Sequence, residues 1–265
     1  MKDYGENLFK GSAKYYSQYR PLYPSALIRF LINRFSLDGH GQMLDLGCGT
    51  GQLALRFSDW FEQIVGIDTE PEMIDEAKRL SNGIRAKNME WFIGDINSYR
   101  SKYDNAFRLV TIAKAFHWMD REVILEILYD IVSTGGGVAI IDNYSPNKKF
   151  LPWQKKVDEV VKHWYGEERR AGSTIYSHPT ISHQEVVENS AFQLETYQMP
   201  IYEQIWTIDA IIGNIYSTSY GSKRFLGNHV HLFEEHLREE LLALKDTGIF
   251  REPIETSVKL AIKNR

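Results

Sequence analysis

The sequence has 265 residues, of which 43% are hydrophobic and 25% are charged, as is ordinary for a soluble globular protein. The formal net charge is −4, and basic residues do not cluster beyond doublets such as Lys148-Lys149. The composition therefore gives no electrostatic footprint for nucleic acid. No apolar run approaches membrane-spanning length. The single cysteine, Cys48, cannot form an internal disulfide, and the sequence has no CxxC motif or Cys/His cluster for zinc.

The first predicted elements are two helical segments within residues 8–37, separated by the stretch YRPLYP at residues 19–24. Pro21 and Pro24 disfavour helix at the residues before them, so a break is expected there. After Pro24, apolar residues recur at helical spacing at Leu27, Ile28, Leu31, Ile32 and Phe35. This pattern predicts a second, amphipathic helix.

Residues 42–145 alternate between apolar runs and helical patterns. The apolar runs lie at 42–46, 63–68, 90–94, 107–113 and 137–142, and the helical patterns lie at 51–60, 71–81 and 120–133. Strands that are apolar throughout and alternate with helices are typical of a parallel sheet covered on both faces.

Residues 146–190 interrupt this alternation, because they are rich in charged and aromatic residues and contain no clear strand. We predict a mostly helical insertion there. A strand pattern returns at 193–204, followed by a helix at 207–217, an amphipathic helix at about 230–245 and a last strand at 254–262.

The stretch MLDLGCGTGQLAL, residues 43–55, places three glycines between a predicted strand and a predicted helix. Gly47, Gly49 and Gly51 permit positive φ, and their lack of a Cβ clears space for a ligand against the backbone. The N-terminus of the following helix would offer unpaired N–H groups to an acceptor such as a carboxylate. The alternative is a purely structural tight turn.

Three acids, Asp45, Asp68 and Asp95, follow three successive predicted strands. Asp68 lies about 20 residues beyond the glycine loop, a spacing that suits an acid accepting hydrogen bonds from ribose hydroxyls. A dinucleotide-binding loop would read G-x-G-x-x-G, but Gln52 stands at the third glycine position, and the Asp45 carboxylate suits a cationic amine better than a pyrophosphate.

Each acid also has a structural interpretation. Asp68 is placed to cap a helix beginning at Glu70-Pro71, Asp95 to form a turn, and Asp45 to hold the backbone N–H groups of the glycine loop. These alternatives stay open at the level of sequence.

The combination resembles the class I S-adenosylmethionine-dependent methyltransferases, in particular the small-molecule group called methyltransferase domain 11 or 25. The similar segments are LDLGCGTG, VGIDTEPEMIDEA, GDI and LVTIAKAFHWMD, and the N-terminal YSQYRPLYP resembles trans-aconitate methyltransferase-like enzymes. The resemblance implies S-adenosylmethionine as cofactor, with S-adenosylhomocysteine as product.

The implied fold is α/β: a Rossmann-like, doubly wound, seven-stranded sheet with the last strand antiparallel, an N-terminal helical lid and a mostly helical insertion after the fifth strand. We expect a single methyltransferase domain over 1–265. Its parts would be the lid helices (1–37), the cofactor-binding core (38–145), the cap over the acceptor side (146–190) and the C-terminal completion of the sheet and acceptor side (191–265).

The resemblance also implies a set of cofactor contacts on the motifs: Asp45, Gly47, Cys48, Gly49, Gly51, Asp68, Thr69, Met73, Asp95, Ile96, Ala113, Tyr19 and Arg20. Asp68 would contact the ribose and Asp95 the adenine amine. Cys48 has no activating basic neighbour in the sequence, so we interpret it as a small side chain beside the ligand.

The expected acceptor site combines residues from three regions: Tyr15, Tyr16, His117, Trp118, Trp206, Tyr216 and Tyr220. In the lid, aromatic rings would exclude water and Arg20 would pair with a carboxylate, whereas the alternative is half-buried packing. His117 is the candidate catalytic residue, as a base or a substrate ligand. Its alternative role is to order its own loop through a backbone hydrogen bond.

These features predict a cytoplasmic methyltransferase, monomer or homodimer, that methylates a small organic acceptor at oxygen or nitrogen without a metal. Arg20 and the resemblance favour a carboxylate-containing acceptor. No membrane or nucleic-acid partner is expected, because AKAFHW stands where DNA amino-methyltransferases carry [DN]-P-P-Y. The alternatives are the same fold binding the cofactor without transfer and an NAD-linked oxidoreductase, which Gln52 and Asp45 disfavour.

Overall fold

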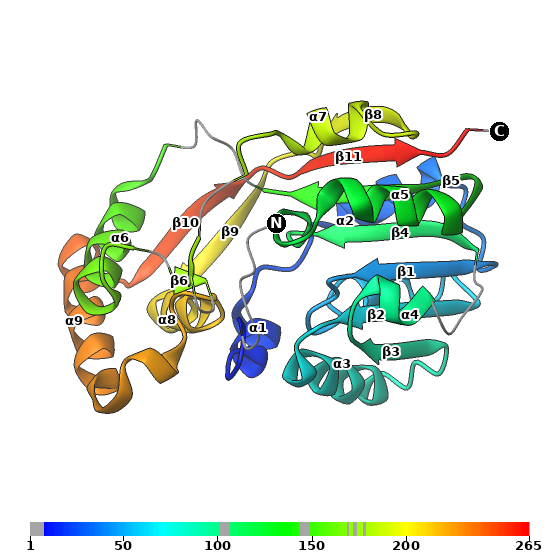
Figure 1. Ribbon diagram of the computed structural model, residues 1–265. Helices are drawn as coiled ribbons and strands as arrows, with labels where there is room; N and C mark the ends of the chain where they lie inside the picture. Colours follow the sequence, from blue (N-terminus) through cyan, green and yellow to red (C-terminus); the bar gives the residue numbers. More distant parts are fainter. Residues whose placement is uncertain are drawn as a thin grey trace.

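A seven-stranded sheet in the order β3-β2-β1-β4-β5-β11-β8 forms the centre of the computed structural model (Figure 1). The model describes residues 8–100, 106–143, 149–168, 170–171, 174–176 and 179–264. The strands of this sheet are β1 (Gln42–Leu46), β2 (Gln63–Asp68), β3 (Met89–Ile93), β4 (Phe107–Ala113), β5 (Val132–Asp142), β8 (Gln193–Gln198) and β11 (Ser257–Ile262). Strands β1 to β5 pair in parallel, and β11 pairs antiparallel with both β5 and β8. The predicted fold class is confirmed.

Helices cover both faces of the sheet because its strands carry apolar side chains on both sides. One face packs against α4 (Ile96–Arg100), α5 (Arg121–Ile131) and α7 (His183–Glu188). The other face packs against α2 (Ser25–Arg34) and the short 3₁₀ helix η1 (Ala54–Phe57). The helix α3 (Pro71–Gly83) lies beside β2 and β3.

A second group of elements forms what we call the cap lobe, seen at the left of Figure 1. It consists of α6 (Pro152–Tyr165), α8 (Ile208–Tyr216), α9 (Val230–Leu244) and the antiparallel pair β9 (Tyr202–Thr207) and β10 (Ile249–Ile254). The short helices η3 (Lys223–Phe225) and η4 (Gly227–His229) connect α8 to α9. Its apolar side chains form a hydrophobic cluster separate from those of the sheet.

The N-terminal helix α1 (Ala13–Tyr19) lies between α3 and the cap lobe. Ser17 Oγ donates to Glu76 Oε1 on α3 at 2.6 Å, and the Tyr19 ring packs against Gly213 of α8. The chain is extended from Arg20 to Pro24 before α2 begins at Ser25, as the prolines predicted.

Several predicted boundaries were wrong. The predicted strand at 193–204 is two strands, β8 and β9, in different sheets; Pro200 between them has no N–H to donate to a sheet. The predicted last strand at 254–262 begins at Ser257, and Ile254 ends β10. The predicted helix at 51–60 is only the 3₁₀ turn η1, and β5 begins at Val132 rather than 137.

Most of the described residues of the insertion predicted at 146–190 lie in the helices α6 and α7. Beside α6 it contains the two-residue strands β6 (Arg170–Ala171) and β7 (Thr174–Ile175), and its last part, α7, packs on the central sheet rather than on the cap lobe. Some of this segment, including Lys148 and Arg169, lies outside the described residues, as do residues 1–7 of the predicted lid.

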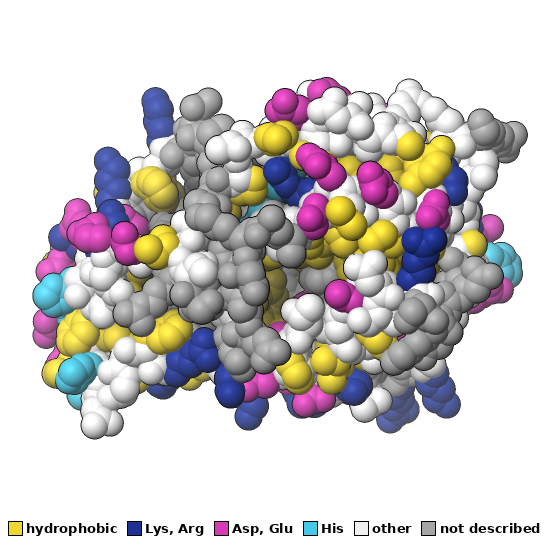
Figure 2. Space-filling view, in the orientation of Figure 1, with side chains coloured by type: hydrophobic (Ala, Val, Ile, Leu, Met, Phe, Trp, Pro, Cys, Tyr) yellow, Lys and Arg dark blue, Asp and Glu magenta, His cyan; other side chains and the backbone are white. Residues whose placement is uncertain are grey.

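The described surface carries charges of both signs. On the face shown in Figure 2, Lys and Arg side chains lie among Asp and Glu side chains over the core and over the cap lobe. No helix of the described chain combines the length and the apolar character needed to cross a bilayer.

The contact between α1 and α8 depends on Gly213, because a Cβ there would lie 2.2 Å from the Tyr19 ring. We expect Gly213→Ala to displace Tyr19 and lower the free energy of unfolding by about 1–3 kcal/mol. Gly83→Ala is the matched control, since a Cβ at that helical glycine meets nothing within 4 Å and should be neutral or stabilising. Urea denaturation of both variants measures the difference, and equal effects would contradict the packing argument.

Candidate functional site

The glycine loop connects β1 to η1 and bonds to the end of β2. Gly47, Gly49 and Gly51 have φ of 71°, 53° and 75°, in the left-handed region that favours glycine. The N–H groups of Gly47 and Cys48 both donate to the Ile67 carbonyl, at 2.8 and 3.0 Å. The loop therefore lies at the carboxyl ends of two neighbouring parallel strands, where ligands collect in such sheets.

Two of the three glycines are required by packing within the protein. A Cβ on Gly47 would lie 2.6 Å from the Ala115 Cβ, and one on Gly51 would lie 2.5 Å from the Trp91 ring. A Cβ on Gly49 would meet only the Tyr16 ring, at an ordinary 3.5 Å. At Gly47 and Gly51 the space that a Cβ would take is filled by the Ala115 and Trp91 side chains, so packing within the protein by itself requires glycine at these two positions.

Asp68, at the end of β2, is hydrogen-bonded to the glycine loop. Its Oδ2 accepts from the Gly49 N–H at 2.8 Å and its Oδ1 from the Glu70 N–H at 2.9 Å. A carboxylate has about four acceptor positions, so each oxygen keeps capacity for a further donor. Burial raises the pKa of Asp68 above its usual value. The bond to the Glu70 N–H ties Asp68 to the residue before α3 but does not cap that helix, and it leaves room for the predicted role in ligand binding.

Asp45 lies beneath the loop, with its side chain buried. Its Oδ1 accepts from the Thr111 hydroxyl at 2.6 Å, and the backbone of Ala54 also donates to it. Burial raises the pKa of Asp45 to about 6. These contacts agree with the alternative in which Asp45 holds backbone N–H groups near the loop.

The remaining predicted cofactor residues differ in exposure. Asp95 is exposed, and its Oδ1 accepts from the Ser98 N–H at 2.8 Å, the turn-forming role, which lowers its pKa. Thr69 is exposed, whereas Met73 and Ile96 are buried in the core. Ala113 ends β4, half-buried against the core, and the Cys48 thiol is buried with a pKa well above its usual value, as expected of an unreactive side chain.

The helix α1 places Tyr16 and Arg20 beside the loop. The Tyr16 ring lies against Gly49, and the Arg20 guanidinium lies 5.0 Å from the centre of that ring. Arg20 Nη2 donates to the Ser217 carbonyl at 3.2 Å, whereas its buried Nε has no hydrogen-bond partner among the described residues. An unpaired buried donor is costly, so Arg20 Nε keeps capacity to donate to an acceptor.

Other predicted aromatic residues lie away from the loop. Tyr15 stacks on Tyr19 and meets the edge of Tyr216, and the buried Tyr216 hydroxyl donates to Glu234 at 2.8 Å. These contacts fit the packing alternative. Trp206 and Tyr220 line a cavity inside the cap lobe instead.

His117 and Trp118 lie in the 3₁₀ helix η2 (Phe116–Trp118) directly after β4. Lys114 before it has a φ of 55°, and its N–H donates to the Ile141 carbonyl at 2.9 Å, which ties the exits of β4 and β5 together. The Trp118 ring lies between the rings of Tyr176, at 5.1 Å, and Phe9, at 6.2 Å, and Phe9 in turn meets Tyr16 at 6.5 Å.

An aromatic row therefore runs from the glycine loop to His117. Phe9 and Tyr176 were not predicted to take part, because no periodicity or motif marks them and only the folded chain brings their segments to Trp118.

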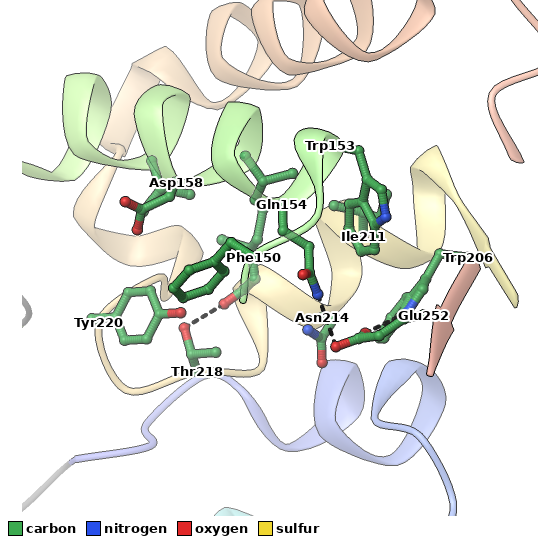
Figure 3. Close-up of a pocket in the computed structure, with 13 residues that line it drawn as sticks. Phe150, Trp153, Gln154, Asp158, Trp206, Ile211, Asn214, Thr218, Tyr220 and Glu252 are labelled. Atoms are coloured by element: carbon green, nitrogen blue, oxygen red, sulfur yellow. Dashed lines mark hydrogen bonds between the residues drawn. The ribbon is translucent and has the colours of Figure 1, made fainter. Parts of the chain in front are cut away.

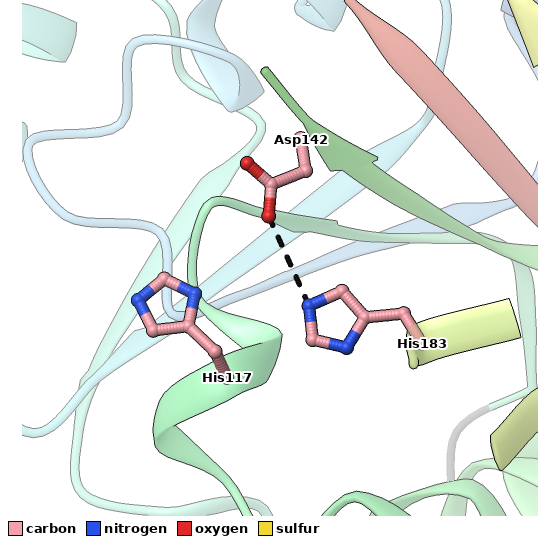
Figure 4. Close-up of side chains that lie close together, drawn as sticks. All are labelled: His117, Asp142 and His183. Atoms are coloured by element: carbon pink, nitrogen blue, oxygen red, sulfur yellow. Dashed lines mark ion pairs between the residues drawn. The ribbon is translucent and has the colours of Figure 1, made fainter. Parts of the chain in front are cut away.

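His117, Asp142 and His183 come together beside this row, each offering an atom within 4.8 Å of the others (Figure 4). His183 Nε2 lies 3.8 Å from Asp142 Oδ2. Arg121 donates to His183 Nδ1 at 3.1 Å, and since arginine only donates, the proton of the neutral imidazole is on Nε2, facing Asp142. Burial lowers the pKa of His183 to about 4, so this ring is neutral at pH 7.

Two imidazoles and a carboxylate are a ligand set that zinc or iron accepts. Here the Arg121 bond keeps the His183 proton on the nitrogen that would face the metal, and the positive charges of Arg121 and Lys259 both act on that ring. The arrangement is better suited to hydrogen bonding than to a divalent cation. Asp142 was missed although it ends a strand like the other acids, and His183 lies in the insertion, which carries no motif.

Comparisons with known proteins match this region. Residues 43–136 match the family model described as "Methyltransferase domain". An uncharacterized methyltransferase of Schizosaccharomyces pombe is 28% identical over 155 residues, 58% of this chain and 59% of the relative. The "Probable S-adenosylmethionine-dependent methyltransferase CRG1" of Saccharomyces cerevisiae is 27% identical over 158 residues, 58% of this chain and 52% of the relative. The matched part thus spans little more than half of either relative.

The fold also matches a solved structure. The crystal structure of the YcgJ protein from Bacillus subtilis superposes with a TM-score of 0.57 at 16% identity, covering 91% of this chain and 99% of that protein. At this identity the likeness shows the fold alone.

The burial of Asp45 predicts that ionisation of its side chain lowers the free energy of unfolding as the pH rises. An acid whose pKa is raised from 3.8 to about 6 on folding binds protons more tightly when folded, so it lowers stability progressively from about pH 4 to pH 6 and fully above. We expect the stability of Asp45→Asn relative to wild type to rise by about 2 kcal/mol between pH 4 and pH 7. Urea denaturation across this range measures it, with Asp59→Asn at an exposed site as control. If the free energy of unfolding varied with pH in the same way for wild type and Asp45→Asn, the prediction would be wrong.

Proposed function

We propose that this chain, which carries a class I methyltransferase domain over residues 43–136, transfers a methyl group from S-adenosylmethionine to a small organic acceptor. The observation that carries the proposal is the join between Gly49 and Asp68 at the carboxyl ends of β1 and β2, beneath the Tyr16 ring. At this join the backbone of Gly49, which has no side chain, the acceptor carboxylate of Asp68 and the ring of Tyr16 lie close together.

The residues at this point fit the cofactor. The remaining acceptor positions of Asp68 suit the two ribose hydroxyls, and the unpaired Arg20 Nε suits the carboxylate of the methionyl group. Asp95, at the end of the neighbouring strand, is the acid available to the adenine amine. When bound, the cofactor supplies an activated methyl group on its sulfonium.

The acceptor site in this proposal lies around His117. The row of Phe9, Trp118 and Tyr176 excludes water from that edge of the sheet. His117 takes the proton released by a hydroxyl or amine acceptor, and the nearby Asp142 carboxylate stabilises the imidazolium that results. His183, whose Nε2 proton faces Asp142, orients that carboxylate.

The charges around His117 favour an acidic acceptor. Arg121 and the half-buried Lys259 both act on His183, against the single negative charge of Asp142. A carboxylate on the acceptor would balance this excess of positive charge. Such an acceptor agrees with the resemblance to trans-aconitate methyltransferase-like enzymes. An acceptor methylated on its own carboxylate would need no base.

Cofactor binding is expected to depend on Asp68. We expect Asp68→Asn to weaken S-adenosylhomocysteine binding ~10- to 100-fold, because the amide accepts fewer hydrogen bonds and carries no charge. The exposed Asp75→Asn, on the neighbouring helix α3, is the matched control. Isothermal titration calorimetry measures the affinity of both variants for S-adenosylhomocysteine. Equal affinities would show that Asp68 does not contact the cofactor. A folded wild type that binds NADH but not S-adenosylhomocysteine would favour the oxidoreductase alternative.

Transfer itself is expected to depend on His117. With methyl-labelled S-adenosylmethionine and a pool of small organic acids and amines, we expect labelled product, and turnover that falls ~10²- to 10⁴-fold in His117→Asn. S-adenosylhomocysteine affinity should be unchanged, and His231→Asn, at an exposed site on α9, should leave both quantities unchanged. A wild type that binds the cofactor but labels nothing in any pool would support the alternative of binding without transfer.

A further inference from the structure

The cap lobe contains a cavity of about 180 Å³ between α6, α8 and β10 (Figure 3). From α8 the lining residues are Ile211, Asn214 and Ile215, whereas Gly213 and Tyr216 of the same helix contact α1. At 3.6 residues per turn these two sets lie on opposite faces of α8. The cavity is therefore separated from the glycine loop by two helices, and no residue of the proposed cofactor site lines it.

Aromatic rings form much of the cavity wall. Phe150, Trp153, Trp206 and Tyr220 line it, and the Trp153 and Trp206 rings lie 6.5 Å apart at 52° to one another. The faces of aromatic rings carry partial negative charge and attract cations, indole most strongly. Figure 3 shows Trp206 beside Glu252 on one side of the cavity and Phe150 beside Tyr220 on the other.

Glu252 and Asn214 place acceptor oxygens in the wall of the cavity. Glu252 is 7% exposed, and its contacts include Gln154 Nε2, which donates to Oε1 at 2.8 Å, and Trp206 Nε1, which donates to Oε2 at 2.9 Å. Asn214 Oδ1 is buried with no hydrogen-bond partner among the described residues.

Asp158 adds a second carboxylate, which Lys162 pairs at 2.9 Å. Within the described chain, the lining residues include no lysine, arginine or histidine.

We propose that this cavity binds a small alkylammonium ion. Its N-alkyl groups would contact the aromatic walls, Glu252 would supply the opposing charge, and Asn214 Oδ1 would accept from any hydroxyl or N–H that the ligand carries. The volume fits such an ion, since a cavity of ~150 Å³ holds a molecule the size of benzene. This site is additional to the proposed methyl transfer, whose acceptor side carries positive charge.

The test compares three probes of nearly one shape on the full-length wild-type protein. They are choline, its neutral carbon isostere 3,3-dimethylbutan-1-ol, and the anion trimethylacetate. Trp153 and Trp206 line the cavity, so tryptophan fluorescence reports binding, and calorimetry gives the affinity. We expect choline to bind at least ~10-fold more tightly than the neutral isostere, and trimethylacetate not to bind.

A variant pair locates the site. Glu252→Gln should weaken choline binding at least ~10-fold and leave the neutral isostere unchanged, whereas Glu255→Gln, at an exposed position nearby, should change neither. S-adenosylhomocysteine affinity should survive in both variants, which separates this result from any failure of the proposed function. If Glu252→Gln does not fold, the comparison of probes on the wild type still decides.

Equal binding of choline and its isostere, preference for the anion, or no binding of choline would each overturn the proposal. So would choline binding that Glu252→Gln leaves intact in a folded protein.

Discussion

The hydrogen bond from the Gly49 N–H to the Asp68 carboxylate joins the ends of two strands that are adjacent in the sheet but about 20 residues apart in sequence. Gly49, which donates this bond, has a positive φ, and Ala115 and Trp91 leave no room for a side chain at Gly47 and Gly51 of the same loop. Packing within the protein therefore requires glycine at two positions of the loop, whether or not a ligand is bound. The same close approach places η2, and with it His117, directly beside the loop.

The parts of this arrangement that the sequence predicted are those carried by local pattern. Apolar runs located β1, β2 and β4 to the residue, and prolines located the break before α2. The doubly wound seven-stranded sheet with its last strand antiparallel followed from the resemblance, whereas the order of the strands was not predicted. Local pattern failed at two boundaries. Pro200 divides a stretch predicted as one strand between two sheets, and the helix expected at 51–60 is a single 3₁₀ turn.

The site was predictable to the same extent. Glycines and acids at strand ends stand out in a sequence, but Phe9, Tyr176 and His183 acquire their neighbours only through long-range packing. The aromatic residues of the C-terminal part show the reverse case. Tyr216 looked available to a ligand, yet its hydroxyl is bound to Glu234 and its ring packs against Phe233 within the cap lobe.

The two faces of α8 have a thermodynamic consequence. One face holds Tyr19 of α1, the helix that covers Gly49, and the other lines the cavity of the cap lobe. If a ligand in the cavity displaces α8, the surface of α8 that packs against Tyr19 moves with it, so occupancy of the cavity would change the position of α1 over Gly49. Linkage then requires the reciprocal effect: a ligand held beneath α1 would change the affinity of the cavity by the same factor. The helix α8 would then couple the two ligand sites, and the affinity for one small molecule would depend on whether the other is bound.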